Sequence, residues 1–342
     1  MGLHTPFLCR SMLRLWSAFR SLWLAAACAA CMPAHGSTPD AAPDAPIEPW
    51  RQWRSVLFRV LPPAAAAPAP PQAADDDAAG ADGASASTPV NYVFGTIHFG
   101  ELDELEVDAD ILREAMRHTR VLVNEVDGAT RWDAAKERYR LLDDPAGLPG
   151  LIGQAAFAEL ARLLPHVPPS LLARLKPWAA LALLEARGEI ASDHTLDRRI
   201  EQWAAALDMR AEHLETLDEQ LAALDCVPSA EQALVLQQRL RTPWLFGEQS
   251  ARVLDYYRSR NLAAWLDEID AMVGLDARAR PIEERARHCL IEARNERWLP
   301  KLETLLRRGG AFVAVGAIHL TGSAGLLERL RRRGFLIVAE PM

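Results

Sequence analysis

Two histidines of this chain stand in the same local sequence pattern. Residues 92–98 and residues 312–319 each begin as a β-prone apolar run and end in Gly-x-x-His, at His98 and His319. Side chains at the ends of buried strands in α/β proteins converge on ligands and metal ions. The glycine lets the backbone turn sharply, or lets a ligand approach where a Cβ would stand. We expect His98 and His319 to share one site, although either histidine alone is more typical of a satisfied core or turn residue.

Glu125 is the natural third member of such a site. It follows the apolar run 121–124, where an unpaired buried charge would be very costly. Two imidazoles and a carboxylate are a common ligand set for zinc-, manganese- or cobalt-like divalent ions that activate water. The alternative for Glu125 is an ion pair with an arginine, and Asp127 is a less buried alternative ligand.

The elements that position these residues come from both ends of the chain. Residues 53–60 and 90–95 are predicted to form an antiparallel hairpin, followed by a capped helix at 108–116 and a strand at 120–126. Strand, helix and strand return at 312–315, 324–332 and 335–338. We therefore expect the α/β class, with a mixed central sheet built from N- and C-terminal segments.

Most of residues 132–298 are predicted to be helical, which gives the fold a large helical middle. Prolines divide this region into separate helices. The expected helices include 155–164, 171–187, 195–207, 230–240 and 251–259, with a short strand at 210–215.

The N-terminal residues are typical of an export signal. Arg10, Arg14 and Arg20 precede a short, Ala-rich apolar stretch, so residues 1–36 are predicted to be a signal peptide. Residues 37–48 are expected to be a flexible linker, and 49–342 one domain with a disordered, low-complexity insert at 62–89. This predicts a periplasmic or cell-envelope protein. A cleaved signal, a retained signal anchor and a lipid on Cys28 or Cys31 all remain open.

Charge and cysteine content narrow the possible partners. The formal charge is -8, and removal of the three signal arginines would leave -8 - 3 = -11. An acidic body argues against nucleic acid as the main partner. Outside the signal region only Cys226 and Cys289 remain. They could pair in an oxidising compartment, but our expectation is two separate buried thiols.

Several segments together resemble the TraB/GumN family, which includes the Tiki metalloproteases. The resemblance covers about residues 50–340 without the insert; each segment is weak alone, but their order is specific. Two departures are a long insert in the first hairpin and residues 193–194, where members have a Gly-containing turn. The segments are 95–100, 125–127, Lys176-Pro177-Trp178, 195–197, 214–216 with 219–220, Arg294-Asn295 with Trp298, and 316–320 with Gly322 and 325–327.

The resemblance implies a metal-dependent hydrolase, and the Tiki members suggest a peptidase with a peptide or protein substrate. His98, Glu125 and His319 would hold the metal ion. Arg294 and Asn295 would stabilise an oxyanion or bind substrate. Glu215 would act as a general base or orient a metal ligand, and its alternative is a capping or ion-pair role.

Other functions stay open because a fold does not determine a reaction. The wider fold relationship includes erythromycin-esterase-like and haem-binding ChaN-like proteins. A non-catalytic envelope protein that binds metal, haem or peptide is therefore one alternative. An interaction module that uses the helical middle as a partner surface is another.

Overall fold

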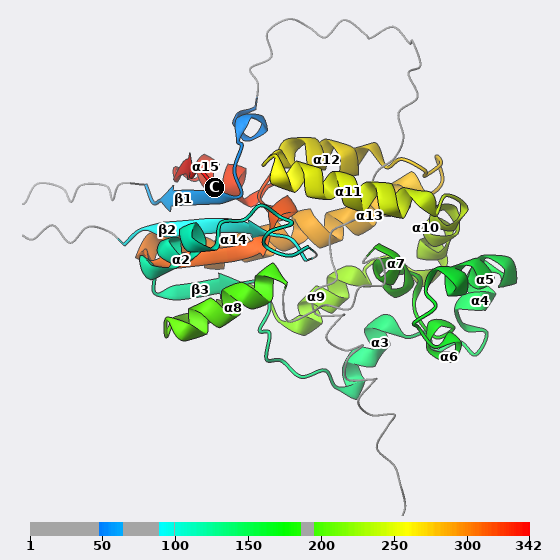
Figure 1. Cartoon of the computed structure of the whole chain (residues 1–342). Coiled ribbons are helices and arrows are strands. Elements are labelled where there is room, and N and C mark those ends of the chain that lie inside the picture. Colours follow the sequence, from blue (N-terminus) through cyan, green and yellow to red (C-terminus); the bar gives the residue numbers. More distant parts are fainter. Residues whose placement is uncertain (1–47, 64–88, 99, 186–194) are drawn as a thin grey trace, which may run out of the picture.

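A computed structural model describes residues 48–63, 89–98, 100–185 and 195–342 (Figure 1). The predicted signal peptide, nearly all of the linker and residues 64–88 of the predicted insert lie outside the described residues. Residues 193–194, where the chain departs from the family pattern, lie outside them too. Within the described ranges, no helix is long and apolar enough to cross a membrane.

Six strands of the described chain form one mixed sheet in the order β4-β3-β5-β2-β1-β6. β2, β3, β4 and β5 run parallel to one another, while β1 is antiparallel to both β2 and β6. The predicted mixed sheet built from both ends of the chain is confirmed. The strands are β1 (Leu57–Leu61), β2 (Asn91–Thr96), β3 (Val121–Asn124), β4 (Arg210–His213), β5 (Ala311–Gly316) and β6 (Leu336–Ala339).

β2 and β5 bring the two histidine-bearing segments together. Their parallel register pairs Tyr92 with Phe312 and Thr96 with Gly316, so both carboxyl ends lie at the same edge of the sheet. Every residue of β5 is buried, as expected for a central parallel strand that is covered on both faces. The strand ends that precede His98 and His319 are therefore direct neighbours.

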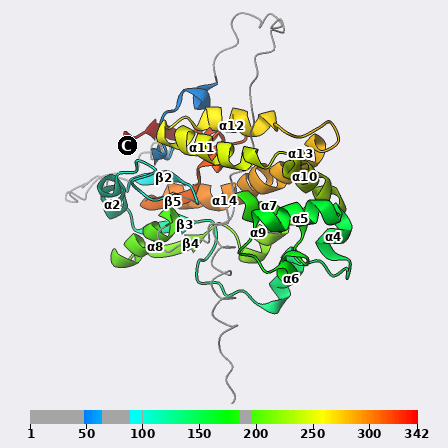
Figure 2. The same cartoon turned by 45° about the vertical axis from the view of Figure 1, so that its right-hand side comes forward.

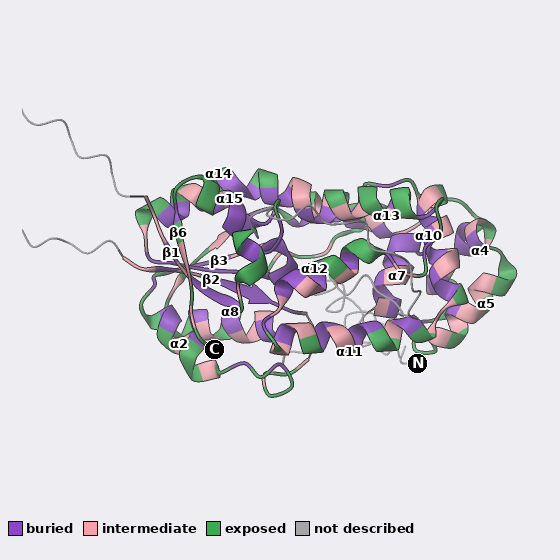
Figure 3. Ribbon diagram, turned by 90° about the horizontal axis from the view of Figure 1, so that it is seen from above, coloured by how far each residue is buried: buried purple, intermediate pink, exposed green. Residues whose placement is uncertain are grey.

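Helices cover the sheet and extend well beyond it. Figure 3 shows α14 and α15 on one side of the strands and α2 on the other, and Figures 1 and 2 place α4, α5 and α10 far from the sheet. The helices are α2 (Ala109–Arg117), α3 (Glu137–Arg140), α4 (Gly147–Ile152), α5 (Gln154–Leu163), α6 (Pro169–Leu172), α7 (Pro177–Glu185), α8 (Leu196–Ala206), α9 (Leu217–Leu224), α10 (Ser229–Arg241), α11 (Trp244–Arg258), α12 (Leu262–Ala271), α13 (Arg280–Arg287), α14 (Ala293–Arg308) and α15 (Leu326–Arg332), with the 3₁₀ turns η1 (Pro49–Gln52), η2 (Ala134–Lys136) and η4 (Ala317–His319) and the π-helical turn η3 (His288–Glu292).

Most predicted helices are confirmed, within the usual uncertainty of helix ends. The Asp108 side chain caps α2 by accepting hydrogen bonds from the backbone N–H groups of Asp110 and Ile111. The predicted helix 251–259 is wrong at its start, because α11 already begins at Trp244, directly after Pro243.

Two further predicted boundaries are wrong because prolines intervene. The predicted helix 171–187 is divided into α6 and α7, since Pro177 lacks an N–H and disfavours a helical residue before it. Leu175 instead forms a β-bridge with Leu141. The predicted strand 53–60 begins only at Leu57, because Pro49 starts the turn η1 upstream.

Cys226 and Cys289 form a disulfide, with their Cα atoms 6.6 Å apart. The expectation of two separate buried thiols is therefore wrong. Cys226 is exposed in the loop after α9, and Cys289 is partly buried in η3. Helix α9 packs against η3, so tertiary packing brings together two cysteines that are 63 positions apart.

Candidate functional site

Arg294 lies at the centre of a buried polar cluster beside the carboxyl-terminal edge of the sheet. It is the second residue of α14 and is 2% exposed. Its Nη2 donates to Oε2 of Glu125 at 2.6 Å and to Oε1 of Glu215 at 2.6 Å. Its Nε donates to Glu215 at 3.0 Å. One guanidinium therefore bridges two carboxyl groups that leave neighbouring strands.

Glu125 follows β3 and is ionised in this arrangement. Besides Arg294, it accepts hydrogen bonds from the backbone N–H of Gly316 at 2.9 Å and from Nε2 of Gln220 at 3.3 Å. Burial opposes the charge, but Arg294, together with His319 and His98, holds the pKa of Glu125 at about 2. The ion pair that was the alternative reading of Glu125 is present.

His319 is fully buried, and its tautomer follows from its neighbours. The side-chain amide of Asn295 donates from Nδ2 to the carbonyls of His319 and Ala324 at 3.1 and 3.0 Å. Its Oδ1 must then accept from Nδ1 of His319 at 2.8 Å, so Nδ1 carries the proton. Burial and Arg294 lower the pKa of His319 to about 3. The ring is neutral, and its Nε2 lone pair faces Nη1 of Arg294 at 3.2 Å.

His98 follows β2 and has a carboxylate as its partner. Its Nδ1 lies 2.8 Å from Oδ2 of Asp197 in α8. Burial disfavours the charged ring, but Asp197 and, more weakly, Glu125 raise the pKa of His98 above its usual value. Asp197 was not predicted as a site residue. Its place in the family-like segment 195–197 was the signal that could have indicated it.

Gly95, the glycine of the first Gly-x-x-His pattern, is needed for close packing between the two strand ends. A Cβ on Gly95 would lie 2.9 Å from Cα of Ala317, a residue of the second pattern. The carbonyl of Gly95 also accepts a hydrogen bond from the buried hydroxyl of Tyr257 at 2.7 Å. This glycine therefore permits the approach of β2 to η4, which carries His319.

Glu215 follows β4 and is bound on several sides. Besides Arg294, Nε1 of Trp298 donates to it at 3.0 Å, and its backbone N–H donates to the carbonyl of Glu125 at 2.9 Å. Burial, the largest influence, raises the pKa of Glu215 despite the opposing effect of Arg294. The structure thus brings Glu125, Glu215, Arg294, Asn295 and His319 into one cluster.

The donor chemistry of this cluster fits a divalent ion, but the spacing in this conformation is not that of a metal site. The Nδ1 atoms of both histidines are held by oxygen atoms, which leaves each Nε2 as the donor, as is usual for metal-binding histidines. Nε2 of His319 lies 4.0 Å from Oε1 of Glu125. Among the residues that the structure describes, no three His, Cys, Asp or Glu side chains are grouped closely enough to hold a metal ion.

The fold and the cluster define a class: α/β proteins in which two adjacent parallel strands end in Gly-x-x-His beside a buried Glu–Arg–Glu ion-pair network. A model of the TraB/PrgY/gumN family matches residues 84–339. The chain belongs to this family, and the resemblance found in its sequence is confirmed. No curated protein and no solved structure matches the chain. β1 lies before the matched region, yet it pairs with β2 in the same sheet.

Proposed function

We propose that this protein is a metal-dependent hydrolase, and specifically a peptidase. One observation carries the proposal: both strand-end histidines have Nδ1 held by an oxygen, His98 by Asp197 and His319 by Asn295. Such partners fix the tautomer and turn Nε2 into a metal donor.

His98, Glu125 and His319 would hold the ion, which when bound would lower the pKa of a water molecule and polarise a carbonyl. The remaining residues orient this set. Asn295 is fully buried, and its amide is used by His319 and the two backbone carbonyls. We therefore assign Asn295 a positioning role, in place of contact with an oxyanion.

Arg294 and Glu215 act together in this proposal. Glu215 accepts from both Arg294 and Trp298, which holds the guanidinium against Glu125. Nη1 of Arg294 also donates to the carbonyl of Leu290 at 3.2 Å; in this proposal it would exchange its contact with Nε2 of His319 for one with a substrate carbonyl. Glu215 is then the counter-ion that keeps Arg294 in place, and its role as a general base stays a prediction.

We also propose that the protein is exported to the periplasm or cell envelope. The Cys226–Cys289 disulfide supports this, because such bonds persist in oxidising compartments and are rare in the cytosol. The residues predicted to be the signal lie outside the described part of the chain. Membrane association through a retained anchor or a lipidated cysteine belongs to the same proposal.

A second candidate function is favoured by a specific contact. Nη1 of Arg294 lies 3.2 Å from Nε2 of His319, on the side where a metal ion would bind. If this contact is permanent, the cluster is a polar core, and the protein is a non-catalytic binding protein for metal, haem or peptide.

Metal analysis of the purified protein, combined with a broad peptide-cleavage screen with and without a chelator, tests these candidates. We expect a divalent ion at about one per chain, chelator-sensitive cleavage, and loss of both in His98→Ala and His319→Ala. His118→Ala is the matched control, because His118 is an exposed histidine at the end of α2. Bound metal without turnover would favour the binding protein. Unchanged metal content in both site variants would refute the shared site.

A further inference from the structure

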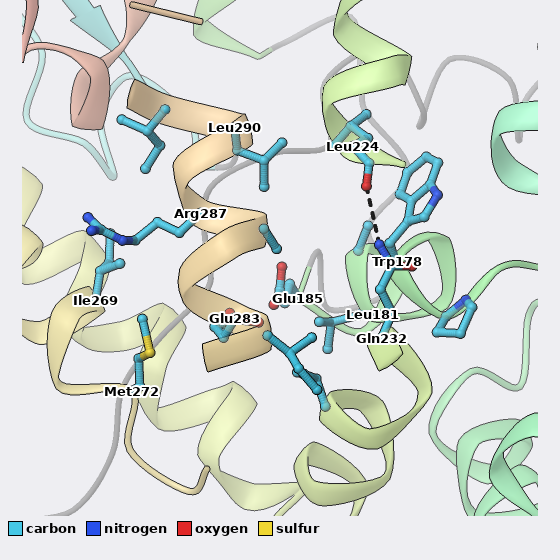
Figure 4. Close-up of a pocket in the computed structure, with 16 residues that line it drawn as sticks. Trp178, Leu181, Glu185, Leu224, Gln232, Ile269, Met272, Glu283, Arg287 and Leu290 are labelled. Atoms are coloured by element: carbon cyan, nitrogen blue, oxygen red, sulfur yellow. Dashed lines mark hydrogen bonds between the residues drawn. The ribbon is translucent and has the colours of Figure 1, made fainter. Parts of the chain in front are cut away.

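A cavity among the helices, away from the sheet, is not used by the proposed catalytic site. Its volume is about 60 Å³, well above the roughly 10–15 Å³ that is the least needed to hold one water molecule. The wall is largely apolar and comes from α7, α9, α10, α12, α13 and η3, together with the residue that follows α12. Figure 4 shows the residues that line it. Its apolar lining includes Trp178, Leu181, Ile269, Met272 and Leu290.

Two carboxyl side chains and one amide side chain line this cavity from three helices. Glu185 at the end of α7 and Glu283 in α13 line it (Figure 4). They are close enough for the charge of Glu283 to raise the pKa of Glu185. Such a carboxyl pair in an apolar wall is costly without a cation between them.

Gln232 of α10 supplies the third acceptor. The residue is 7% exposed, and its Nε2 donates to the carbonyl of Leu224 at 3.5 Å (Figure 4). This bond fixes the orientation of the amide. Its Oε1 is buried and has no hydrogen-bond partner among the described residues. A buried amide oxygen without a donor is uncommon, and here it leaves an acceptor position for a ligand.

The arginines nearby neutralise this carboxyl pair only in part. Arg239 of α10 lies 3.7 Å from Glu283, and its Nη1 donates to the carbonyl of Val273 at 3.0 Å. Arg287 of α13 is held by Asp270 and Glu292, at 3.0 Å each. Arg287 lines the cavity but is paired with Asp270 and Glu292, so among the described residues Arg239 is the one guanidinium paired with a carboxyl group of the cavity.

We propose that this cavity binds a primary ammonium group carried on a short hydrocarbon chain, with Glu185, Glu283 and Gln232 as its acceptors. An ammonium has three N–H donors and no acceptor, which suits a cavity wall that carries two carboxyl groups and an amide. The hydrocarbon lies against the apolar wall. A free alkylamine and the side chain of a lysine both present this chemistry. The site is independent of the proposed metal chemistry, because none of its acceptors belongs to the Arg294 cluster.

Binding of an ammonium also changes the protonation of the carboxyl groups in the cavity. Burial, followed by the charge of Glu283, raises the pKa of Glu185 to about 8, while Arg239 opposes the rise. Burial likewise raises the pKa of Glu283, against Arg239 and Arg287. Glu185 is therefore largely protonated at pH 7. An ammonium that binds beside it displaces the proton of the Glu185 carboxyl group into solution.

The test uses n-hexylamine as the probe, with n-hexanol and hexanoate as uncharged and anionic analogues of the same length. Isothermal calorimetry of the full chain at pH 7, in two buffers of different ionisation enthalpy, measures both affinity and proton release. We expect saturable binding of the amine with release of up to one proton. The alcohol should bind roughly ten- to a hundred-fold more weakly, as expected for loss of a charged hydrogen bond. A short acetylated and amidated peptide with one central lysine then distinguishes the two sources: tighter binding of the peptide assigns a lysine side chain, and tighter binding of the amine assigns a free alkylamine.

Variants locate the binding. Glu185→Gln should weaken amine binding by about the factor that separates the amine from the alcohol. It should also abolish the proton release. Leu181→Trp, which fills the cavity, should remove binding of both amine and alcohol. Glu284→Gln is the matched control, because Glu284 is exposed on the same helix as Glu283. The proposal is overturned if the amine does not saturate, if the three probes bind equally, or if Glu185→Gln matches Glu284→Gln while retaining its fold by circular dichroism.

Discussion

Arg294→Met tests whether one guanidinium stabilises the whole polar cluster. The change keeps an unbranched side chain of moderate length but leaves Glu125 and Glu215 buried without their shared partner. The pKa of Glu125, about 2 against 4.5 for an ordinary glutamate, corresponds to a net interaction of about 3 kcal/mol with its charged form. Arg294 is the largest favourable contribution. Since Glu215 loses the same partner, we expect a loss of about 3–5 kcal/mol in the free energy of unfolding.

Urea unfolding at pH 7 with chelator present, followed by tryptophan fluorescence and circular dichroism, measures this loss. Arg297→Met is the matched control: Arg297 also approaches Glu215, at 3.6 Å, but its side chain is 45% exposed. Arg297→Met should lower the free energy of unfolding by less than about 1 kcal/mol. Adding Glu215→Gln to Arg294→Met should restore part of the stability, so that the double variant is more stable than the sum of the single effects. The reasoning is refuted if Arg294→Met costs no more than Arg297→Met, or if the two site substitutions are additive.

Three other perturbations address separate parts of the structure. Gly95→Ala should destabilise by about 1–3 kcal/mol, because its Cβ meets backbone at 2.9 Å; Gly247→Ala in α11, where a Cβ has open space, should stabilise by about 0.5–1 kcal/mol. Cys289→Ser should lower the free energy of unfolding by about 4 kcal/mol, from the loop-closure entropy of a separation of 63 residues. Glu185→Gln should stabilise the protein progressively as the pH rises from about 4.5 to 8, by about 2 kcal/mol after allowance for partial exposure of the side chain.

The sign of the pH effect follows from the direction of the shift. The pKa of Glu185 is higher in the folded chain than in the unfolded chain, so wild-type stability falls as the pH rises through this window, and glutamine removes that loss. Urea midpoints at pH 5 and pH 8 measure it, with Glu284→Gln as control. A gain in stability that does not grow with pH contradicts the assigned burial of Glu185.

Reduction by dithiothreitol is the control for Cys289→Ser. It should lower the stability of the wild type as much as the substitution does, and it should leave the stability of the variant unchanged.

The sequence predicted the sheet and the placement of the site better than it predicted the contacts within the site. Continuous β-prone apolar runs indicated β2 and β5, and their Gly-x-x-His ends indicated His98 and His319. The contacts of Asp197 with His98 and of Asn295 with His319 could not be predicted, because both partners reach the histidines from helices whose packing is set by the whole core. The disulfide was missed for the same reason, since no spacing rule shows that two cysteines 63 positions apart are close.

The position of Arg294 depends on a feature that helical periodicity does not reveal. η3 is a π-helical turn, and a single such turn rotates the residues that follow it relative to a regular α-helix. Arg294 and Asn295 then contact the two ring nitrogens of His319, while Trp298, one turn later, packs against the ring at 4.6 Å between centroids. Three residues of one helix therefore fix this imidazole on two edges and a face.

Cys289 lies within η3, so the disulfide ties the π-helical turn to the loop after α9. The same helix α9 begins two residues after Glu215, the partner of Arg294. The disulfide therefore links two segments that lie close in sequence to the two members of this ion pair: η3 precedes Arg294, and α9 follows Glu215. Opening the disulfide should therefore loosen the surroundings of Arg294 more than the sheet. Amide hydrogen exchange in Cys289→Ser should rise first in η3 and α9, whereas equal increases in β2 and β5 would contradict this coupling.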